Sequence, residues 1–209
     1  MSDIVIVSAA RTPVGSFNGS FSDMSAADLG SIAIKEAINR AKVKTSEVSE
    51  VIMGQVLTAS CGQNPARQAS INAGIPNEIT AYTINQVCGS GLRSIALGWQ
   101  SIMNDESEII VAGGQENMTQ APHCFHLRQT GKMGDAEMID SMIKDGIWDI
   151  SDIVILIAYI VNQDSSDNAQ LSNGDINQES NRKFLGDKEN GEQEVIHTVS
   201  VAANADQPT

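Results

Sequence analysis

The sequence has few basic residues for its length, and this shortage narrows what the chain can bind. Its 209 residues include 13 Lys and Arg against 26 Asp and Glu, which gives a formal net charge of -13 and a pI near 4.5. A nucleic-acid or anionic-membrane surface needs concentrated positive charge, so neither is an expected partner. The composition predicts an acidic, soluble protein.

Long apolar runs and export signals are also missing. No run approaches the roughly 18 apolar residues that a membrane-spanning helix requires. The first residues, Met1 to Ser8, lack a basic stretch followed by an apolar segment of export-signal length. These absences predict a cytoplasmic location and no membrane partner.

Cysteines are scarce and widely spaced. Cys61, Cys88 and Cys124 are odd in number, lie far apart and form no Cys-x-x-Cys pair. This pattern favours neither a disulfide framework nor a zinc site, so three free thiols and no metal are expected. Apolar residues, by contrast, make up 41% of the chain, which is enough for a substantial core.

Strand-like and helix-like segments alternate through the first 114 residues. Short β-branched or apolar runs predict strands, and apolar residues at helical spacing predict helices. The predicted strands are 4–7, 51–53, 80–85 and 108–112, the last closed by Gly113 and Gly114. The predicted helices are 25–40, 64–73 and one that begins after Cys88. This order predicts an α/β layered fold with a largely parallel sheet.

Two of the predicted helices carry further local signals. In the first, Ser25 is placed as the N-cap with Asp28 at the capping-box position. In the third, Leu92, Ile95, Trp99 and Met103 recur at helical spacing and are expected to face the core.

The character of the sequence changes near residue 150. A dense apolar run at 153–161 is followed by a polar, acidic stretch, and residues 150–209 hold 10 of the acidic residues but only 3 of the basic ones. Residues 162–194 have few large apolar side chains and are expected to be mobile or disordered.

The chemistry-bearing segment is Asn85-Gln-Val-Cys88-Gly-Ser-Gly91, where a predicted strand delivers a cysteine to a glycine-rich turn and a helix. The positive end of a helix favours a thiolate, and its N–H groups can stabilise an oxyanion on an attacked thioester carbonyl. A second interpretation is that Cys88 is a small buried hydrophobic residue at a tight turn. The spacing alone leaves both interpretations open.

Four segments, in this order, resemble the motifs of the thiolase family. They are Val5 to Phe17, Gly62 to Ala69, Asn85 to Gly91 and Ala112 to Met118. The similarity continues through 132–140 to Trp148 and Asp149, which resemble the start of the family's inserted CoA-binding loop region. The chain thus resembles the N-terminal half of a biosynthetic-type thiolase.

The resemblance implies an organisation and a chemistry. It implies a thiolase-like N-terminal α/β domain over 1–120 and the start of the CoA-binding loop region over 121–149, leaving a divergent acidic tail, partly disordered, over 150–209. The family's cysteine at the position of Cys88 takes an acyl group from acyl-CoA as a thioester, and a second acyl-CoA then attacks it. CoA thioesters are thus the implied substrates, without a metal or prosthetic group, and a homo-oligomer or other self-association is implied.

Other family features have no counterpart in these 209 residues. The Gly-His-Pro, Cys-x-Gly and Asn-Glu-Ala-Phe segments that carry the family's base, second cysteine and water-holding asparagine are not present. His123, His126 and His197 do not match the family base and are expected to be ordinary surface histidines. Residues 150–209 show only a weak likeness, at 194–200, to a strand of the family's loop region, and either divergence or a damaged gene would explain them.

Three functions therefore stay open. The first is an acetyl-CoA C-acetyltransferase, catalytically incomplete as this chain. The second is a non-catalytic truncated fragment or association module. The third is a ketoacyl-carrier-protein synthase, which shares the fold and the cysteine at a helix start, although the segments 62–67 and 112–116 favour thiolase. Arg67, Arg93 and Arg128 are not assigned to CoA, and the CoA-binding residues stay unknown.

Overall fold

A computed structural model describes residues 3–126, 135, 137–144, 161–163 and 197–202 of the chain. It contains a six-stranded sheet in the order β3-β2-β4-β8-β1-β7 and a two-stranded pair of β5 and β6. The strands of the large sheet are β1 (Asp3–Thr12), β2 (Glu50–Gly54), β3 (Thr80–Ile84), β4 (Ile110–Gly114), β7 (Val161–Gln163) and β8 (His197–Ala202). The helices are α1 (Ala26–Ala41), α2 (Pro65–Asn72) and α3 (Ser90–Met103), and two short 3-10 turns are Thr45–Glu47 and Met118–Gln120.

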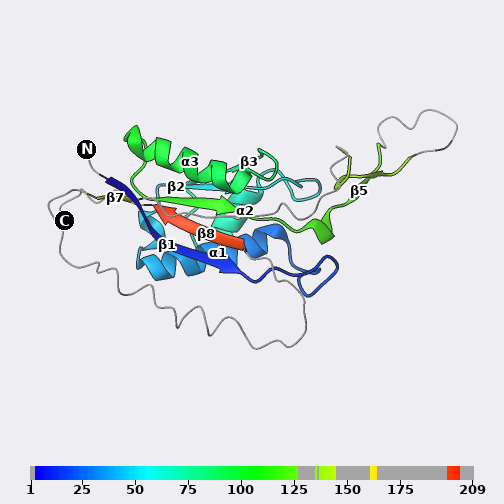
Figure 1. Cartoon of the computed structure of the whole chain (residues 1–209), viewed down its shortest axis with the longest axis horizontal. Helices are drawn as coiled ribbons and strands as arrows, with labels where there is room; N and C mark the ends of the chain where they lie inside the picture. Colours follow the sequence, from blue (N-terminus) through cyan, green and yellow to red (C-terminus); the bar gives the residue numbers. More distant parts are fainter. Residues whose placement is uncertain (1–2, 127–134, 136, 145–160, 164–196, 203–209) are drawn as a thin grey trace.

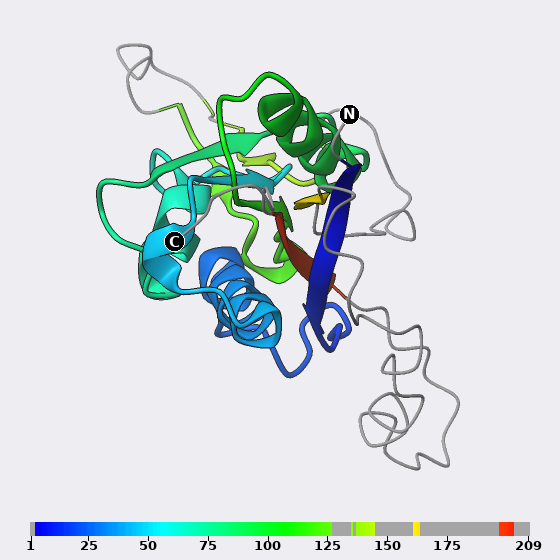
Figure 2. The same cartoon turned by 90° about the vertical axis from the view of Figure 1, so that its left-hand side faces the viewer.

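The helices form layers on the two sides of the sheet. The helix α3 covers one face, while α1 and α2 pack side by side on the other (Figures 1 and 2). The α/β layered fold predicted from the sequence is confirmed. Fully buried side chains between the layers include Ile34, Ile52, Met53, Ile110 and Val111.

Three strands form the parallel part of the sheet. The central β2 pairs in parallel with β3 on one side and with β4 on the other. Gly54 at the end of β2 lies opposite Ile84 of β3 and Gly114 of β4. The three strands therefore end at one level, and the residues that follow them share the carboxyl edge of the sheet.

The strand β8 makes the sheet mixed. It lies between β4 and β1 and is antiparallel to both, and β7 is antiparallel to β1. Both strands come from the segment expected to form a divergent tail. Pairing with β8 also explains why β1 continues to Thr12, opposite His197, where the sequence predicted a strand of residues 4–7. Local patterns cannot reveal a partner that lies nearly 200 residues away.

Local sequence signals correctly predicted where α1 begins. The Ser25 hydroxyl accepts a hydrogen bond from the Asp28 N–H at 3.0 Å, and the Asp28 carboxylate accepts one from the Ser25 N–H at 3.3 Å. This is the predicted capping box, and it satisfies N–H groups that have no partner within the helix. The helix ends at Ala41, and its C-cap Lys42 has a left-handed φ of 58°.

The prediction that the whole apolar stripe of the third helix faces the core is wrong for three of its four residues. Ile95 is buried, but Leu92, Trp99 and Met103 are 60%, 45% and 47% exposed. The side of the helix that faces the sheet carries Ile95, Gly98 and Ile102 together with small polar residues, so it is offset from the apolar stripe. Helical spacing alone could not say which side would be covered.

The remaining elements extend from the sheet. Strands β5 (His123–Cys124) and β6 (Ile139–Asp140) pair antiparallel after β4. The apolar run at 153–161 and the stretch 162–194 lie outside the described residues, apart from 161–163. Among the residues that the structure describes, no helix is long and apolar enough to cross a membrane.

Candidate active site at the carboxyl edge of the sheet

Polar residues gather immediately after the three parallel strands. Gln55 follows β2, Asn85 follows β3, and Gln115 and Glu116 follow β4. Since the strands end at one level, these residues occupy the same edge of the sheet. Ligands of open α/β sheets bind at the carboxyl ends of the strands, so this edge is where a site is expected.

Cys88 lies at this edge, in the turn between β3 and α3, and its thiol is exposed. This exposure shows that the alternative interpretation of Cys88 as a small buried hydrophobic residue is wrong. The helix α3 begins two residues later, with Gly89 as its N-cap. The Gly89 and Ser90 N–H groups donate to the Gln86 and Val87 carbonyl oxygens at 3.1 and 3.0 Å. An anion at this end of α3 would therefore rely on N–H groups further along the first turn and on the positive end of the helix dipole.

The residue before the cysteine is held in an unfavourable conformation. Val87 has a φ of 50°, in the left-handed region that β-branched residues rarely adopt. Such a conformation costs about 1–3 kcal/mol and persists only when surrounding contacts enforce it. It makes the chain turn sharply between β3 and α3, so that Cys88 stands out from the sheet.

Three hydrogen bonds enforce this turn. The Val87 N–H donates to the Asn85 Oδ1 at 2.9 Å, and the Gln86 N–H donates to the Ser90 Oγ at 2.9 Å. The Ser90 hydroxyl in turn donates to the Val87 carbonyl oxygen at 2.5 Å. Asn85 and Ser90, on either side of Cys88, thus fix the backbone that carries the thiol.

Close packing fixes the start of α3 against the sheet. A Cβ on Gly54, at the end of β2, would lie 2.6 Å from the Ser90 Cβ and 2.8 Å from the Gly91 nitrogen. The Ser94 hydroxyl lies 2.9 Å from the carbonyl oxygen of Gly113 in β4. Only glycine at position 54 lets the helix approach the strand this closely.

Glu116 is a buried carboxylate of the same edge, with an exposed fraction of 8%. It accepts hydrogen bonds from the Val56 N–H at 2.8 Å and from the Leu57 N–H at 3.2 Å. Burial raises the pKa of Glu116 to about 7, against the opposing effect of these two N–H groups. Glu116 lies in one of the segments that resemble the thiolase family, but the sequence analysis assigned it no role, because its burial depends on tertiary packing.

A buried amide pair links the ends of β2 and β4. The Gln115 Nε2 donates to the Gln55 Oε1 at 2.9 Å, and the Gln55 Nε2 donates to the Leu57 carbonyl oxygen at 2.9 Å. Sequence reasoning missed Gln55. Its position directly after a strand, next to a glycine, was the available signal.

The other two thiols have different surroundings. Cys61 and Cys124 are both half-buried, and the Cys61 Sγ lies 3.5 Å from the Leu57 carbonyl oxygen. The described part of the chain has no group of three or more His, Cys, Asp or Glu residues that could hold a metal ion.

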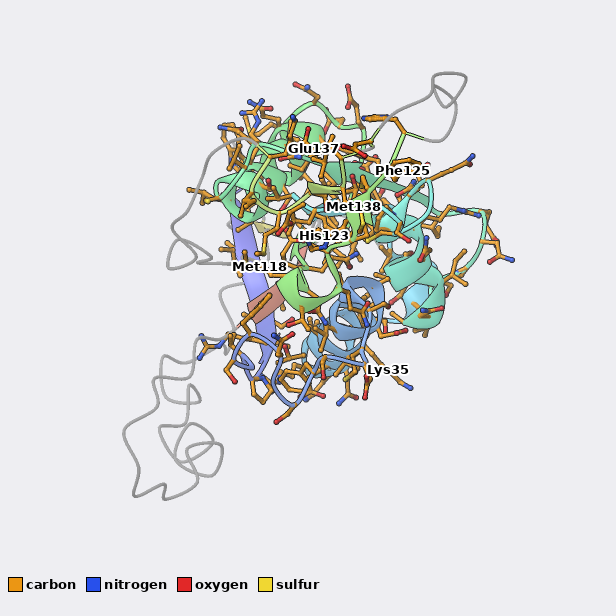
Figure 3. All side chains as sticks on the ribbon, turned by 90° about the vertical axis from the view of Figure 1, so that its right-hand side faces the viewer. Lys35, Met118, His123, Phe125, Glu137 and Met138 are labelled. Carbon is orange, nitrogen blue, oxygen red and sulfur yellow. The ribbon has the colours of Figure 1, made fainter. Side chains whose placement is uncertain are left out.

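The histidines belong to strands β5 and β8 or lie just beyond β5, and none is in the turn that carries Cys88. His123 belongs to β5, where its Nε2 is 3.8 Å from an Asp140 oxygen, and Figure 3 shows it on the same side of the molecule as Phe125 and Met138. His126 is exposed just beyond β5, and His197 is in β8.

Arg67 and Arg93 lie on different helices, α2 and α3. The Arg67 guanidinium donates to the Asn77 carbonyl oxygen at 2.9 Å and thereby fastens the loop after α2. Arg93 is exposed on α3, and Arg128 lies outside the described residues.

The family model for the thiolase N-terminal domain matches residues 4–158. The chain belongs to the thiolase family. An acetyl-CoA acetyltransferase of Paracoccus denitrificans is 58% identical over 149 residues, which are 71% of this chain and 38% of that protein. A cytosolic acetyl-CoA acetyltransferase of Rattus norvegicus is 54% identical over 146 residues, covering 70% of this chain and 37% of its own length.

A solved structure agrees with this family membership. Human mitochondrial 3-ketoacyl-CoA thiolase in complex with CoA matches with a TM-score of 0.62 and 40% identity, over 68% of this chain and 36% of that chain. This thiolase-family chain thus spans little more than a third of the length of the relatives it matches. The motifs that carried the resemblance lie inside the matched region.

Proposed function

We propose that the chain carries the acyl-accepting cysteine of an acetyl-CoA acetyltransferase. The Cys88 sulfur attacks the thioester carbonyl carbon of acetyl-CoA, a new carbon–sulfur bond forms, and CoA leaves as its thiol with the proton lost by Cys88. The observation that carries the proposal is the exposed thiol at the start of α3, on the sharp turn at the carboxyl edge of the sheet. Relatives named acetyl-CoA acetyltransferase support acetyl-CoA as the substrate.

Two segments favour a thiolase over a ketoacyl-carrier-protein synthase. Segment 62–67 caps α2, where the Asn64 Oδ1 accepts the Arg67 N–H at 3.1 Å. Segment 112–116 provides Gln115 and Glu116 at the site edge. Both segments were part of the thiolase resemblance, and both lie within the match to the family model.

Acyl transfer to Cys88 is tested by incubating the chain with acetyl-CoA and locating the added acetyl group by peptide mass spectrometry. The expected result is one acetyl group on the Cys88 peptide, lost in Cys88→Ala and retained in Cys61→Ala. Acetylation spread evenly over the three cysteines, or none on Cys88, would contradict the proposal.

Carbon–carbon bond formation is a separate question for these 209 residues. It needs a base for the substrate α-carbon and a second oxyanion site, and the segments to which the resemblance assigns them are not in this sequence. Missing acid/base help and a missing oxyanion donor together cost about 10⁴-fold or more in rate. We therefore expect this polypeptide to form an acyl-enzyme without turning over acetoacetyl-CoA. Thiolysis at high protein concentration measures this, and turnover within tenfold of a typical rate, abolished in Cys88→Ala, would show a complete site.

We further propose that two copies of the chain associate through the exposed face of α3. Leu92, Trp99 and Met103 are all on this helix and all exposed, and monomers seldom leave large contiguous apolar patches in water. Trp99→Ser combined with Leu92→Ser should shift sedimentation to the monomer. Ile32→Ser, at an exposed apolar residue of α1 on the other side of the sheet, is the matched control. A dilution-stable monomer of the unmodified chain would contradict this proposal.

A further inference from the structure

A chain of hydrogen bonds connects the buried Glu116 to the turn that carries Cys88. It begins after β4, crosses the segment that follows β2, and ends in the residues that follow β3. The linked residues are far apart in the sequence, but few hydrogen bonds separate them, because each step joins the ends of neighbouring strands. We infer that Glu116 is a positioning residue for Cys88, an inference that rests on the proposed role of Cys88 as acyl acceptor.

The first step holds the segment after β2. The Glu116 carboxylate accepts the Val56 N–H at 2.8 Å and the Leu57 N–H at 3.2 Å. Glu116 is 8% exposed, so few water molecules are available to replace it as an acceptor for these groups. Val56 and Leu57 are half-buried, so water replaces a lost acceptor of their N–H groups only in part, and the segment would move to regain one.

The second step passes from this segment to the turn. The Asn85 Nδ2 donates to the Val56 carbonyl oxygen at 3.3 Å, while the Asn85 Oδ1 accepts the Val87 N–H at 2.9 Å. The Asn85 side chain thus bonds to Val56 through its amide nitrogen and to Val87 through its amide oxygen, so a shift of Val56 affects how Val87 is held. Val87 is the residue with the left-handed backbone, one position before the thiol.

The consequence is that Glu116 helps to keep Cys88 at the start of α3. If residue 56 moves, Asn85 loses one of its two contacts and holds Val87 less firmly. Val87 can then relax to an ordinary φ and displace Cys88 from its position just before α3. Strain of this kind, once released, shifts the balance between two backbone conformations by about five-fold or more.

The test measures the alkylation rate of each cysteine by iodoacetamide at neutral pH, with quantification by mass spectrometry. In Glu116→Ala, Cys88 should react about five-fold or more slowly than in the unmodified chain. Cys124, which belongs to β5 and takes part in none of these hydrogen bonds, is the internal reference and should keep its rate. Glu116→Gln retains an acceptor oxygen of equal reach and should restore the Cys88 rate.

Two further variants separate positioning from general destabilisation. Ile34→Ala removes a fully buried side chain of α1 and should lower stability without slowing Cys88 selectively. Asn85→Ala changes an exposed residue, so it should leave the fold intact and slow Cys88 as Glu116→Ala does. An unchanged Cys88 rate in both Glu116→Ala and Asn85→Ala would overturn the inference, as would a Gln variant as slow as the Ala variant.

The alkylation assay does not involve acetyl-CoA, so the two proposals can fail separately. If acetyl-CoA leaves Cys88 unmodified while Glu116→Ala slows alkylation, the proposed function fails and the positioning role stands. If Cys88 is acetylated but its alkylation rate is unchanged in Glu116→Ala and Asn85→Ala, the proposed function stands and the positioning role fails.

Discussion

The interior of the parallel sheet and its carboxyl edge differ sharply over a few residues. In β2, Val51, Ile52 and Met53 are apolar and fully buried, and the next buried side chain after Gly54 is the polar Gln55. The interior stabilises the fold through burial of apolar surface. The edge adds costs, since Val87 is strained and the buried Gln115 Oε1 has no hydrogen-bond partner among the described residues. Backbone strain and unpaired buried polar atoms concentrate at functional sites. They distinguish the edge residues that form the candidate site from the interior residues that stabilise the fold.

The largest expected effect belongs to the interior. Ile52→Ala removes a fully buried side chain at the centre of the sheet and should lower the free energy of unfolding by about 2–5 kcal/mol. Cys88→Ala, at an exposed position of the edge, should change it by less than about 0.5 kcal/mol while removing acyl transfer. Urea unfolding of both variants measures the difference. A Cys88→Ala variant as unstable as Ile52→Ala would break the distinction between the two regions.

A second effect concerns the cost of burying Glu116 at the edge. Burial raises its pKa from an ordinary value of 4.5 to about 7, so between these pH values the folded state holds a proton that the unfolded state has lost. The free energy of unfolding should therefore fall as pH rises through this window, by about 3 kcal/mol in total from this group.

The Glu116→Gln variant isolates this contribution. Its free energy of unfolding should lack this fall between pH 4.5 and pH 8, so the curves of the variant and the unmodified chain should diverge as pH rises. Denaturant unfolding at several pH values provides both curves. Parallel curves would mean that burial of the Glu116 carboxylate does not lower the free energy of unfolding at high pH, contrary to what its surroundings indicate.

The smallest effect tests the contact between interior and edge. Gly54→Ala places a Cβ 2.6 Å from Ser90, which should cost about 1–3 kcal/mol and displace the start of α3, slowing alkylation of Cys88. Gly98→Ala, in the middle of the same helix, meets Ile110 at 3.1 Å and is the matched control. It should leave the Cys88 rate unchanged. Equal slowing by both variants would show that general disturbance of α3, rather than the fit at Gly54, controls the thiol.

The sequence by itself determined the local elements and the position of the candidate nucleophile. Ser25 and Asp28 fixed the start of α1, Asn64 and Pro65 that of α2, because caps depend on residues within one helical turn. The ordered motifs placed Cys88 between a strand and a helix, and the match over residues 4–158 confirms the family.

Only the tertiary structure decided what depends on contacts between distant residues. It inserted β8 between β1 and β4, left Leu92, Trp99 and Met103 exposed, and exposed the thiol of Cys88 rather than burying it. It also buried Glu116 and joined it to a segment 59 and 60 positions earlier in the chain. Sequence periodicity shows which side chains are apolar. Burial, strand pairing and pKa depend instead on the residues that pack nearby, and these come from distant parts of the sequence.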